Sequence, residues 1–483
     1  MKAVNLFIIL LFVSQIALAQ FELIWKGPNG NNPISAIQDS DTTIIFLNLE
    51  YDINAQIESS QILKLNTETT IISESEYIYE NRDSHFTILN RINDTEYMAF
   101  GFVSSKTSDD HNFTVAKFNS DLDILFTKEY VFSQEQSFYT FSHKNNAGNF
   151  VIAGTSAFEH PTDCISFLFE VNEYGDSIRS FIFDDNFMII WDIDEKYGTD
   201  NYNLLTTGYG LYRGILEINE TFDFVSFTVY PPDLGFYQSS KLTNEGTCYL
   251  TGARNVMGST GFNRKDFYIL KYDTTNTLLA ENSFGKVDTA EYPATHQSID
   301  FIDADNIYYS GTSNFSYFHP WATEPSWIML TNLDSNLNIR WQKYYGGDAY
   351  YTAFNLIATN DGGCILFNTI YDMETIGDFD IHIMKVDSLG NQYPVGIKPS
   401  AGIKSTELIA YPNPGTNYLK IKASLPHNNT HFELYNINGQ QILCKKISES
   451  ETQFDLSQQP AGIYFYRYLR KGEIVEFGKW VKN

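Results

Sequence analysis

Three side chains near residue 380 have the types and spacing that acid–base chemistry needs. In the segment Asp378-Phe379-Asp380-Ile381-His382 every second residue is ionisable, and alternate residues of a strand share one face. Two carboxyl groups and an imidazole on one face can exchange protons with a bound substrate. Isolated Asp residues at strand starts are also common on solvated edges, and we interpret this segment as such an edge.

A second acidic segment, Asp-Ile-Asp-Glu-Lys-Tyr-Gly at residues 192–198, begins with the spacing of a calcium loop. It lacks the third ligand, the central glycine and the closing glutamate in register, so we interpret it as a connection between strands. The chain also lacks a serine-hydrolase elbow, a zinc-protease motif, a P-loop and a dinucleotide fingerprint. The sequence therefore predicts no catalytic residue, no metal and no cofactor.

A third segment, residues 313–327 (SNFSYFHPWATEPSW), is more aromatic than a solvent loop needs. Its candidate ligand-binding residues are Tyr317, His319, Trp321 and Trp327. Flat aromatic rings suit sugar rings or peptide side chains, because they bring a large rigid surface at low entropic cost. In the alternative interpretation, the insert packs down on its own part of the fold as a small core.

The elements that would position these residues are predicted to be strands throughout. Aromatic residues make up 16% of the 483 residues, and the short apolar stretches are separated by Gly, Asn, Asp and Ser clusters, which is the all-β pattern. The formal net charge of −27 excludes nucleic acid as a partner, because phosphate binding needs a basic surface.

Two signatures recur seven times along the chain. The first is an apolar run that ends in Gly or Asn, and the second is a strand that ends in Asn or Asp. The first ends at residues Asn48, Gly101, Gly154, Gly208, Gly252, Gly311 and Asn368. The second ends at residues Asn66, Asn119, Asn172, Asn219, Asp273, Asp334 and Asp387.

One repeat contains four strands and three turns in about fifty residues, which is typical of a propeller blade. We therefore predict a seven-bladed β-propeller of four-stranded blades over residues 20–398. The seventh repeat has Pro394 where its fourth strand should be, and proline removes a donor from a sheet. Residues 21–27 resemble the missing strand, with Trp25 matching Trp341, so we expect them to close the last blade.

Residues 1–19 have the features of a secretory signal peptide. Lys2 precedes an apolar run, and Ala17-Leu18-Ala19 is a small-x-small cleavage pattern. We expect cleavage after Ala19 and no transmembrane helix in the remainder. The cysteines are scattered without metal-binding spacing, and we expect them to be free and buried. They are Cys164, Cys248, Cys364 and Cys444.

The C-terminal part differs from the rest in charge. Residues 408–483 hold nine Lys or Arg against six Asp or Glu, a net of +3, whereas the residues before them have a net charge of −30. The small, polar residues 399–407 are predicted to be a linker. Beyond them, alternating strands separated by Asn-Gly, Pro-Ala-Gly and Lys-Gly turns predict a small β-sandwich.

This segment resembles the type A C-terminal sorting domain of the type IX secretion system of Bacteroidetes. The resemblance rests on the Tyr-Pro-Asn-Pro motif, the hairpin around an Asn-Gly turn, a Pro-Ala-Gly turn with its strand, and the basic end. The matching residues are Tyr411, Pro412, Asn413, Pro414, Gly439, Gly462, Tyr464 and Lys479. The resemblance implies export through a translocon that reads the folded sandwich; in that family the domain is often removed by a sortase-like peptidase.

Three classes of function stay open for the propeller. It is a binding or adhesion module for glycan, peptide or protein, or a secreted lyase, lactonase or hydrolase, or a structural component of the envelope. Asp and His side chains gathered at the channel mouth would favour the enzyme, and exposed aromatic rows would favour binding. We expect a secreted or cell-surface monomer whose main role is binding.

Overall fold

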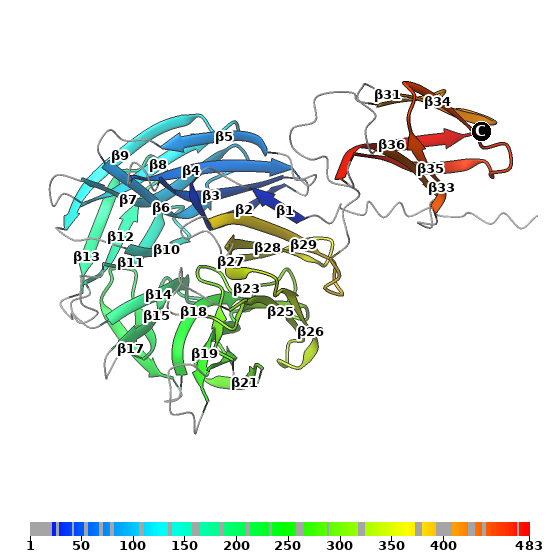
Figure 1. Ribbon diagram of the computed structural model, residues 1–483. Helices are drawn as coiled ribbons and strands as arrows, with labels where there is room; N and C mark the ends of the chain where they lie inside the picture. Colours follow the sequence, from blue (N-terminus) through cyan, green and yellow to red (C-terminus); the bar gives the residue numbers. More distant parts are fainter. Residues whose placement is uncertain are drawn as a thin grey trace, which may run out of the picture. The chain divides into compact units, whose positions relative to one another are not determined.

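In the computed structural model every described element of the protein is a β-strand (Figure 1). The chain forms two compact units, Met1–Tyr393 and Pro394–Asn483, and each is described by itself. The structure describes residues 22–25, 29–40, 43–52, 57–66, 71–77, 82–105, 111–133, 138–156, 165–183, 188–208, 213–230, 234–256, 265–286, 289–316, 324–371, 379–392, 408–423, 430–436, 441–470 and 473–483.

Seven antiparallel sheets form the first unit and confirm the propeller. The first three blades are β2(Gly30–Ser40), β3(Thr43–Asp52), β4(Ile57–Asn66), β5(Ile71–Tyr77); β6(Arg82–Arg91), β7(Glu96–Ser105), β8(His111–Asn119), β9(Ile124–Ser133); and β10(Phe138–Lys144), β11(Phe150–Ser156), β12(Ile165–Val171), β13(Ser177–Ile182). The fourth and fifth are β14(Met188–Glu195), β15(Tyr202–Gly208), β16(Gly214–Ile218), β17(Phe224–Val229); and β18(Leu234–Leu242), β19(Cys248–Asn255), β20(Lys265–Tyr272), β21(Leu278–Phe284). The sixth has β22(Glu291–Pro293), β23(Ile299–Asp300), β24(Ile307–Ser313), β25(Trp327–Leu333) and β26(Ile339–Gly346).

The seventh blade combines strands from both ends of the unit. It contains β27(Tyr350–Ala358), β28(Cys364–Tyr371) and β29(Phe379–Val386), with β1(Glu22–Trp25) as the fourth strand. β1 lies antiparallel to β29, with Trp25 opposite Ile381. Trp25 therefore occupies the place that Tyr345 has opposite Ile328 in the sixth blade, not the place of Trp341. This pairing covers an edge of β29 that would otherwise expose its backbone.

The second sequence signature has a local physical cause. In six blades its Asn or Asp side chain accepts the backbone N–H groups two and four residues later, as in Asp387, which binds Leu389 N at 2.9 Å and Asn391 N at 2.7 Å. The residue three positions later has a positive φ, such as 68° at Gly390 and 66° at Leu337. A side-chain acceptor that satisfies two turn N–H groups favours this hairpin.

The register corrects one repeat boundary. Each second-signature residue lies five positions after the partner of the first signature; Asn172, for example, follows Phe167, which pairs with Gly154. In the fourth blade the same offset from Asn219 leads to Gly214, and Gly214 pairs with Thr206. In the fourth blade Thr206 is therefore the residue that corresponds to Gly154, and the predicted first-signature residue, Gly208, lies two positions too far toward the C-terminus.

The innermost strands carry a bulge at a repeated position. The register shifts by one residue next to the first-signature position in five of the seven blades, at residues Ile34, Thr87, Trp191, Gln238 and Phe354. A bulge exchanges the faces to which the following side chains point. Apolar residues of successive blades pack between the sheets, and the contacts run on from β27 to β2, so the blades form a closed ring (Figure 1).

Two sheets form the second unit, which agrees with the predicted sandwich. One contains β30(Leu408–Tyr411), β31(Tyr418–Ala423) and β34(Glu451–Asp455), and the other contains β32(Thr430–Asn436), β33(Gln441–Ile447), β35(Gly462–Arg470) and β36(Glu473–Lys482). Tyr464, Tyr466, Tyr468 and Trp480 are buried in its core, because alternate residues of β35 and β36 point inward.

The predicted burial of the cysteines is confirmed at two positions and wrong at a third. Cys248 and Cys364 are free and buried as predicted, but Cys444 is exposed, so its predicted burial was wrong. Cys164, the signal segment 1–19 and the linker 399–407 lie outside the described residues. None of the described segments is a helix with the length and apolar character needed to cross a membrane.

Candidate functional site

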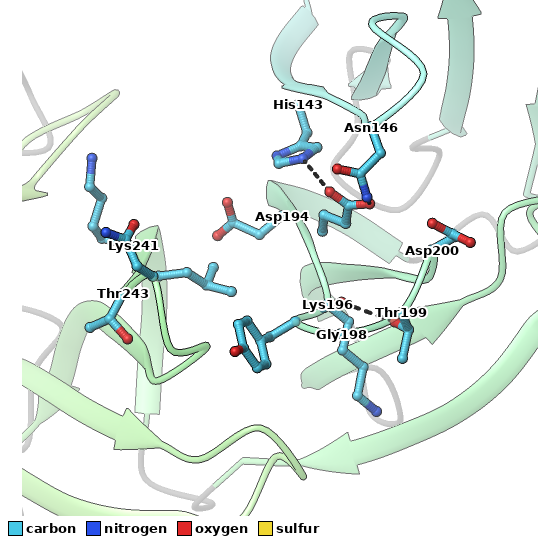
Figure 2. A pocket seen from close by; sticks show the side chains of 13 residues that line it. His143, Asn146, Asp194, Lys196, Gly198, Thr199, Asp200, Lys241 and Thr243 are labelled. Atoms are coloured by element: carbon cyan, nitrogen blue, oxygen red, sulfur yellow. Dashed lines mark hydrogen bonds and ion pairs between the residues drawn. The ribbon is translucent and has the colours of Figure 1, made fainter.

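A pocket of about 750 Å³ lies where the innermost strands of the third, fourth and fifth blades end. Its wall comes from the ends of β10, β14 and β18 and from the turns that follow these strands. Figure 2 shows Asp194 between the side of the pocket formed by His143 and Asn146 and the side formed by Lys241 and Thr243. The turn at residues 196–200 completes the wall.

The bulge in β14 decides which way its acidic residues face. Met188, Ile190 and Ile193 belong to one apolar cluster with residues of the third blade. Ile190 and Ile193 are three residues apart, and a regular strand would place them on opposite faces. The register shift at Trp191 accounts for this change. Asp192 and Asp194 are thereby turned toward β18 of the fifth blade, where both meet Ser240.

Asp192 and Asp194 share one hydroxyl group. Ser240 Oγ lies 2.9 Å from Asp192 Oδ2 and 2.7 Å from Asp194 Oδ2, while Ser240 N donates to Asp192 Oδ2 at 2.6 Å. A hydroxyl has a single hydrogen to donate, so only one carboxylate can accept it. The arrangement is satisfied when Asp194 carries a proton and donates to Ser240 Oγ, which in turn donates to Asp192.

The electrostatic surroundings favour that proton on Asp194. Burial, and next the charge of Asp192, raise the pKa of Asp194 above its ordinary value. Burial also raises the pKa of Asp192, but the hydrogen bonds from Ser240 act against this rise. Asp194 therefore has the more strongly raised pKa and is the better proton carrier of the two.

The cations beside the pocket are already paired. Lys241 Nζ lies 2.9 Å from Asp300 Oδ1; burial alone would lower the pKa of Lys241, but the Asp300 charge and then Asp194 and Asp192 outweigh it and raise the pKa. Lys196 Nζ lies 2.7 Å from Glu217 Oε2.

The imidazole in the wall is neutral at physiological pH. Burial lowers the pKa of His143 to about 4. Its contact with Glu195, 3.5 Å from Nε2 to Oε2, is therefore not an ion pair at neutral pH. Burial and the nearby Asp200 raise the pKa of Glu195, and Asn146 donates to the other oxygen of this carboxyl at 2.6 Å.

The acidic motifs singled out in the sequence take different places. Residues 192–198 form the end of β14 and its turn, and two of their carboxyl groups, Asp194 and Glu195, line the pocket. Among the residues that the structure describes, no three His, Cys, Asp or Glu side chains are grouped to hold a metal ion.

The predicted solvated edge at residues 378–382 was wrong for its described part. Asp380 and His382 are 8% and 3% exposed, because β29 lies between β28 and β1. His382 is held by the edge of the Tyr351 ring at 5.4 Å between centroids and by Asn368 at 3.3 Å. Asp378 lies outside the described residues.

The aromatic insert is described only in part. Trp327 begins β25, and Lys286 Nζ lies 4.4 Å from the centre of one of its rings and 3.7 Å from the Tyr344 ring. One face of Trp327 is thus covered by an ammonium group. Tyr317, His319 and Trp321 lie outside the described residues. The insert connects β24 to β25, the second and third strands of its blade. This connection lies at the end of the blade opposite the turns that follow the first strands and form the pocket.

The Tyr-Pro-Asn-Pro motif of the sandwich holds the last strand. Asn413 Nδ2 donates to Lys479 O at 2.6 Å, Val481 N donates to Asn413 Oδ1 at 2.9 Å, and Trp480 Nε1 donates to Pro412 O at 2.7 Å.

The other matched residues have separate places. Tyr411 ends β30, and Pro414 follows Asn413 in the turn that leads to β31. Gly462 begins β35 with a φ of 155°, Tyr464 is buried in the core and its hydroxyl donates to Pro460 O, and Gly439 lies outside the described residues.

Sequence reasoning missed the pocket. Asp192, Asp194 and Glu195 were seen only as a failed calcium loop, while Ser240 and Lys241 carried no motif. The alternation of polar and apolar residues places Asp192 on the face of Ile190, and the bulge at Trp191 reverses that placement. The bulges recur at one position of the repeat, but they are visible only in the pairing of the strands, which the sequence does not show.

Several solved structures share features of the fold at low identity. One is PorZ, an essential surface component of the type IX secretion system of Porphyromonas gingivalis (10% identity, TM-score 0.31, covering 92% of this chain and 69% of that one). Another is the β-propeller domain of the Trilobed protease from Pyrococcus furiosus (10% identity, TM-score 0.41, covering 78% and 98%). A third is a protein of unknown function from Dyadobacter fermentans (8% identity, TM-score 0.41, covering 64% and 96%).

No curated protein matches the chain. The family comparison finds the secretion system C-terminal sorting domain at residues 409–483, which is the segment of the predicted sandwich. The protein therefore carries a type IX sorting domain at residues 409–483, behind a seven-bladed propeller, and is directed to the cell surface or the extracellular space.

Proposed function

We propose that the secreted propeller is a non-catalytic binding module whose ligand is a glycan, held in the pocket between the third, fourth and fifth blades. The observation that carries the proposal is the internal pairing of the two lysines in the wall. Lys241 is paired with Asp300, Lys196 is paired with Glu217, and the proton on Asp194 satisfies its carboxyl. An anionic ligand would have to break these lysine pairs, whereas a neutral ligand leaves them intact.

The remaining polar groups match a ligand rich in hydroxyls. The wall offers the amides of Asn146 and Asn244, the hydroxyls of Thr199 and Thr243, and the carboxyl of Asp194. Sites that bind uncharged ligands combine a few such placed polar groups with a flat apolar surface. Tyr197, which is 52% exposed at the pocket, supplies a ring on which a sugar can stack.

Binding of the full-length protein to a glycan array, followed by titration calorimetry on the hits, tests the proposal. Tyr197→Ala should weaken binding at least tenfold, because it removes the stacking surface. Tyr174→Ala is the matched control, since Tyr174 is 61% exposed on a hairpin turn that is not part of the pocket. Equal affinities of both variants and the wild type would place the ligand elsewhere, and an empty array would favour a structural role.

The shared hydroxyl favours a second candidate function, hydrolysis of the bound glycan. A protonated Asp194 that faces the pocket can act as a general acid. In that case the wild type would release reducing ends from the glycan that it binds, and Asp194→Asn would abolish release while keeping the affinity. Binding without any product over long incubation supports the non-catalytic module.

The aromatic insert stays a separate prediction. Tyr317, His319 and Trp321 would form a binding surface at the opposite end of the blades, with Trp327 already covered by Lys286. Trp321→Ala tested on the same array distinguishes the two surfaces. A loss of binding in Trp321→Ala and not in Tyr197→Ala would move the binding function to the insert.

A further inference from the structure

One face of the sorting domain exposes apolar side chains that the sandwich core does not need. On β35, Ile463 and Phe465 are 43% and 42% exposed. In the register of β35 and β36, Ile463 lies opposite Val481 and Phe465 lies opposite Lys479. These four side chains are neighbours on one side of the sheet, and we call this side the outward face.

The matched motif holds this face in place. Asn413 binds the backbone on both sides of Trp480, at Lys479 O and Val481 N, and Trp480 itself is buried. Lys482 is buried as well, and its Nζ donates to Leu456 O at 2.7 Å and Ser457 O at 3.2 Å. With Trp480 and Lys482 fixed inward, Lys479 and Val481 must point outward. The contacts between the Tyr-Pro-Asn-Pro turn and the C-terminal strand thus fix which side chains of that strand belong to the outward face.

The rim of the outward face is basic. Lys446 is exposed on β33, opposite His431, and Lys479 is exposed on β36. The acid on the described part of this face, Glu433, is paired with Arg467 at 2.7 Å. The face therefore combines an apolar centre with cations at its edges, in a segment whose net charge is +3.

We propose that the outward face is the surface by which the protein docks on the secretion machinery, against an apolar patch bordered by carboxylates. The family match makes that machinery the occupant, because residues 409–483 form a sorting domain. The charges agree with an acidic partner. Such a surface attracts the segment with a net of +3 and repels residues 1–407, which have a net of −30, so the sorting domain docks and the propeller stays clear.

Export of full-length variants from the native host tests this inference. Phe465→Glu removes the apolar centre, and Lys479→Glu reverses a rim charge on an exposed side chain that does not enter the core. The matched control is Tyr418→Glu, because Tyr418 is 39% exposed on the other sheet. Each variant is measured as the ratio of surface and medium protein to periplasmic protein, and its folding is checked by thermal unfolding of the purified chain.

Phe465→Glu and Lys479→Glu should each lower the exported fraction at least tenfold while their unfolding temperatures stay near that of the wild type. Tyr418→Glu should be exported normally. Normal export of folded Lys479→Glu together with folded Phe465→Glu overturns the inference, and so does an equal loss in Tyr418→Glu. If Phe465→Glu does not fold, Lys479→Glu alone decides. None of these outcomes depends on whether the propeller binds a glycan.

Discussion

Replacement of Asp194 by Asn tests the proton that the pocket geometry requires. The folded state raises the pKa of Asp194, chiefly through burial and then through Asp192, so the folded protein binds this proton more tightly than the unfolded chain. Stability is then greatest below the unfolded Asp pKa of about 3.9 and falls as the pH rises toward the folded pKa. Asn cannot titrate, and its amide can donate to Ser240 Oγ as the protonated acid does.

The size of the effect follows from linkage. Each unit by which folding raises a carboxyl pKa costs about 1.4 kcal/mol of unfolding free energy at a pH above the folded pKa. That figure is an upper limit, because Asp194 is only half-buried and lines a pocket. Wild type and Asp194→Asn should therefore be equally stable near pH 4. As the pH rises to 8, the variant should become more stable than the wild type by up to about 1.4 kcal/mol for each unit by which folding raises the pKa of Asp194.

Urea unfolding of the full chain at several pH values, followed by tryptophan fluorescence, measures the difference. Glu173→Gln is the control, because Glu173 is an exposed carboxylate away from the pocket. Its stability should follow the wild type at every pH. A constant difference between wild type and Asp194→Asn from pH 4 to 8 would refute the shared-proton arrangement, since Asp194 would then titrate as an ordinary carboxyl group.

Three further predictions concern the fold. Asp387→Ala should lower the unfolding free energy by about 1–2 kcal/mol, because two hydrogen bonds to backbone N–H groups are lost. Asp387→Asn should cost little, because Asn serves the same turn at Asn119. Equal losses of unfolding free energy in the two variants would contradict the acceptor role. Removal of residues 1–28 should expose the edge of β29 and make the purified propeller aggregate, as measured by light scattering, and a stable monomer would argue against closure by β1. Lys482→Met should lower the melting temperature of the sorting domain in calorimetry, because the carbonyls of Leu456 and Ser457 lose a buried donor. An unchanged melting temperature would show that water replaces the ammonium group as donor.

The blade count could be predicted because its signals are local. In six blades the Asn or Asp at the end of the third strand satisfies N–H groups two and four residues away, as Asn119 does, and nothing distant is needed to form that turn. The sorting domain was recognisable for a related reason. Its motif residues lie far apart in the chain, but each has a chemically restricted place, such as Asn413 between Lys479 and Val481.

The pocket could not be predicted, because its residues come from three blades and are positioned by packing. Asp194, Ser240 and His143 lie about fifty residues apart in the chain, and only the packing of successive blades brings their strands side by side. The proton on Asp194 depends on burial by other blades and on Asp192, which a bulge turns toward the same hydroxyl.

The sequence by itself determined the all-β class, the number of repeats and the destination of the protein, since turn chemistry and motif residues act at short range or in a fixed order. The tertiary structure decided which carboxyl groups face a cavity, which stay buried, as Asp380 does, and which face of the sorting domain is displayed. These properties depend on neighbours from distant parts of the chain, and burial and charge at a site are sums over all such neighbours.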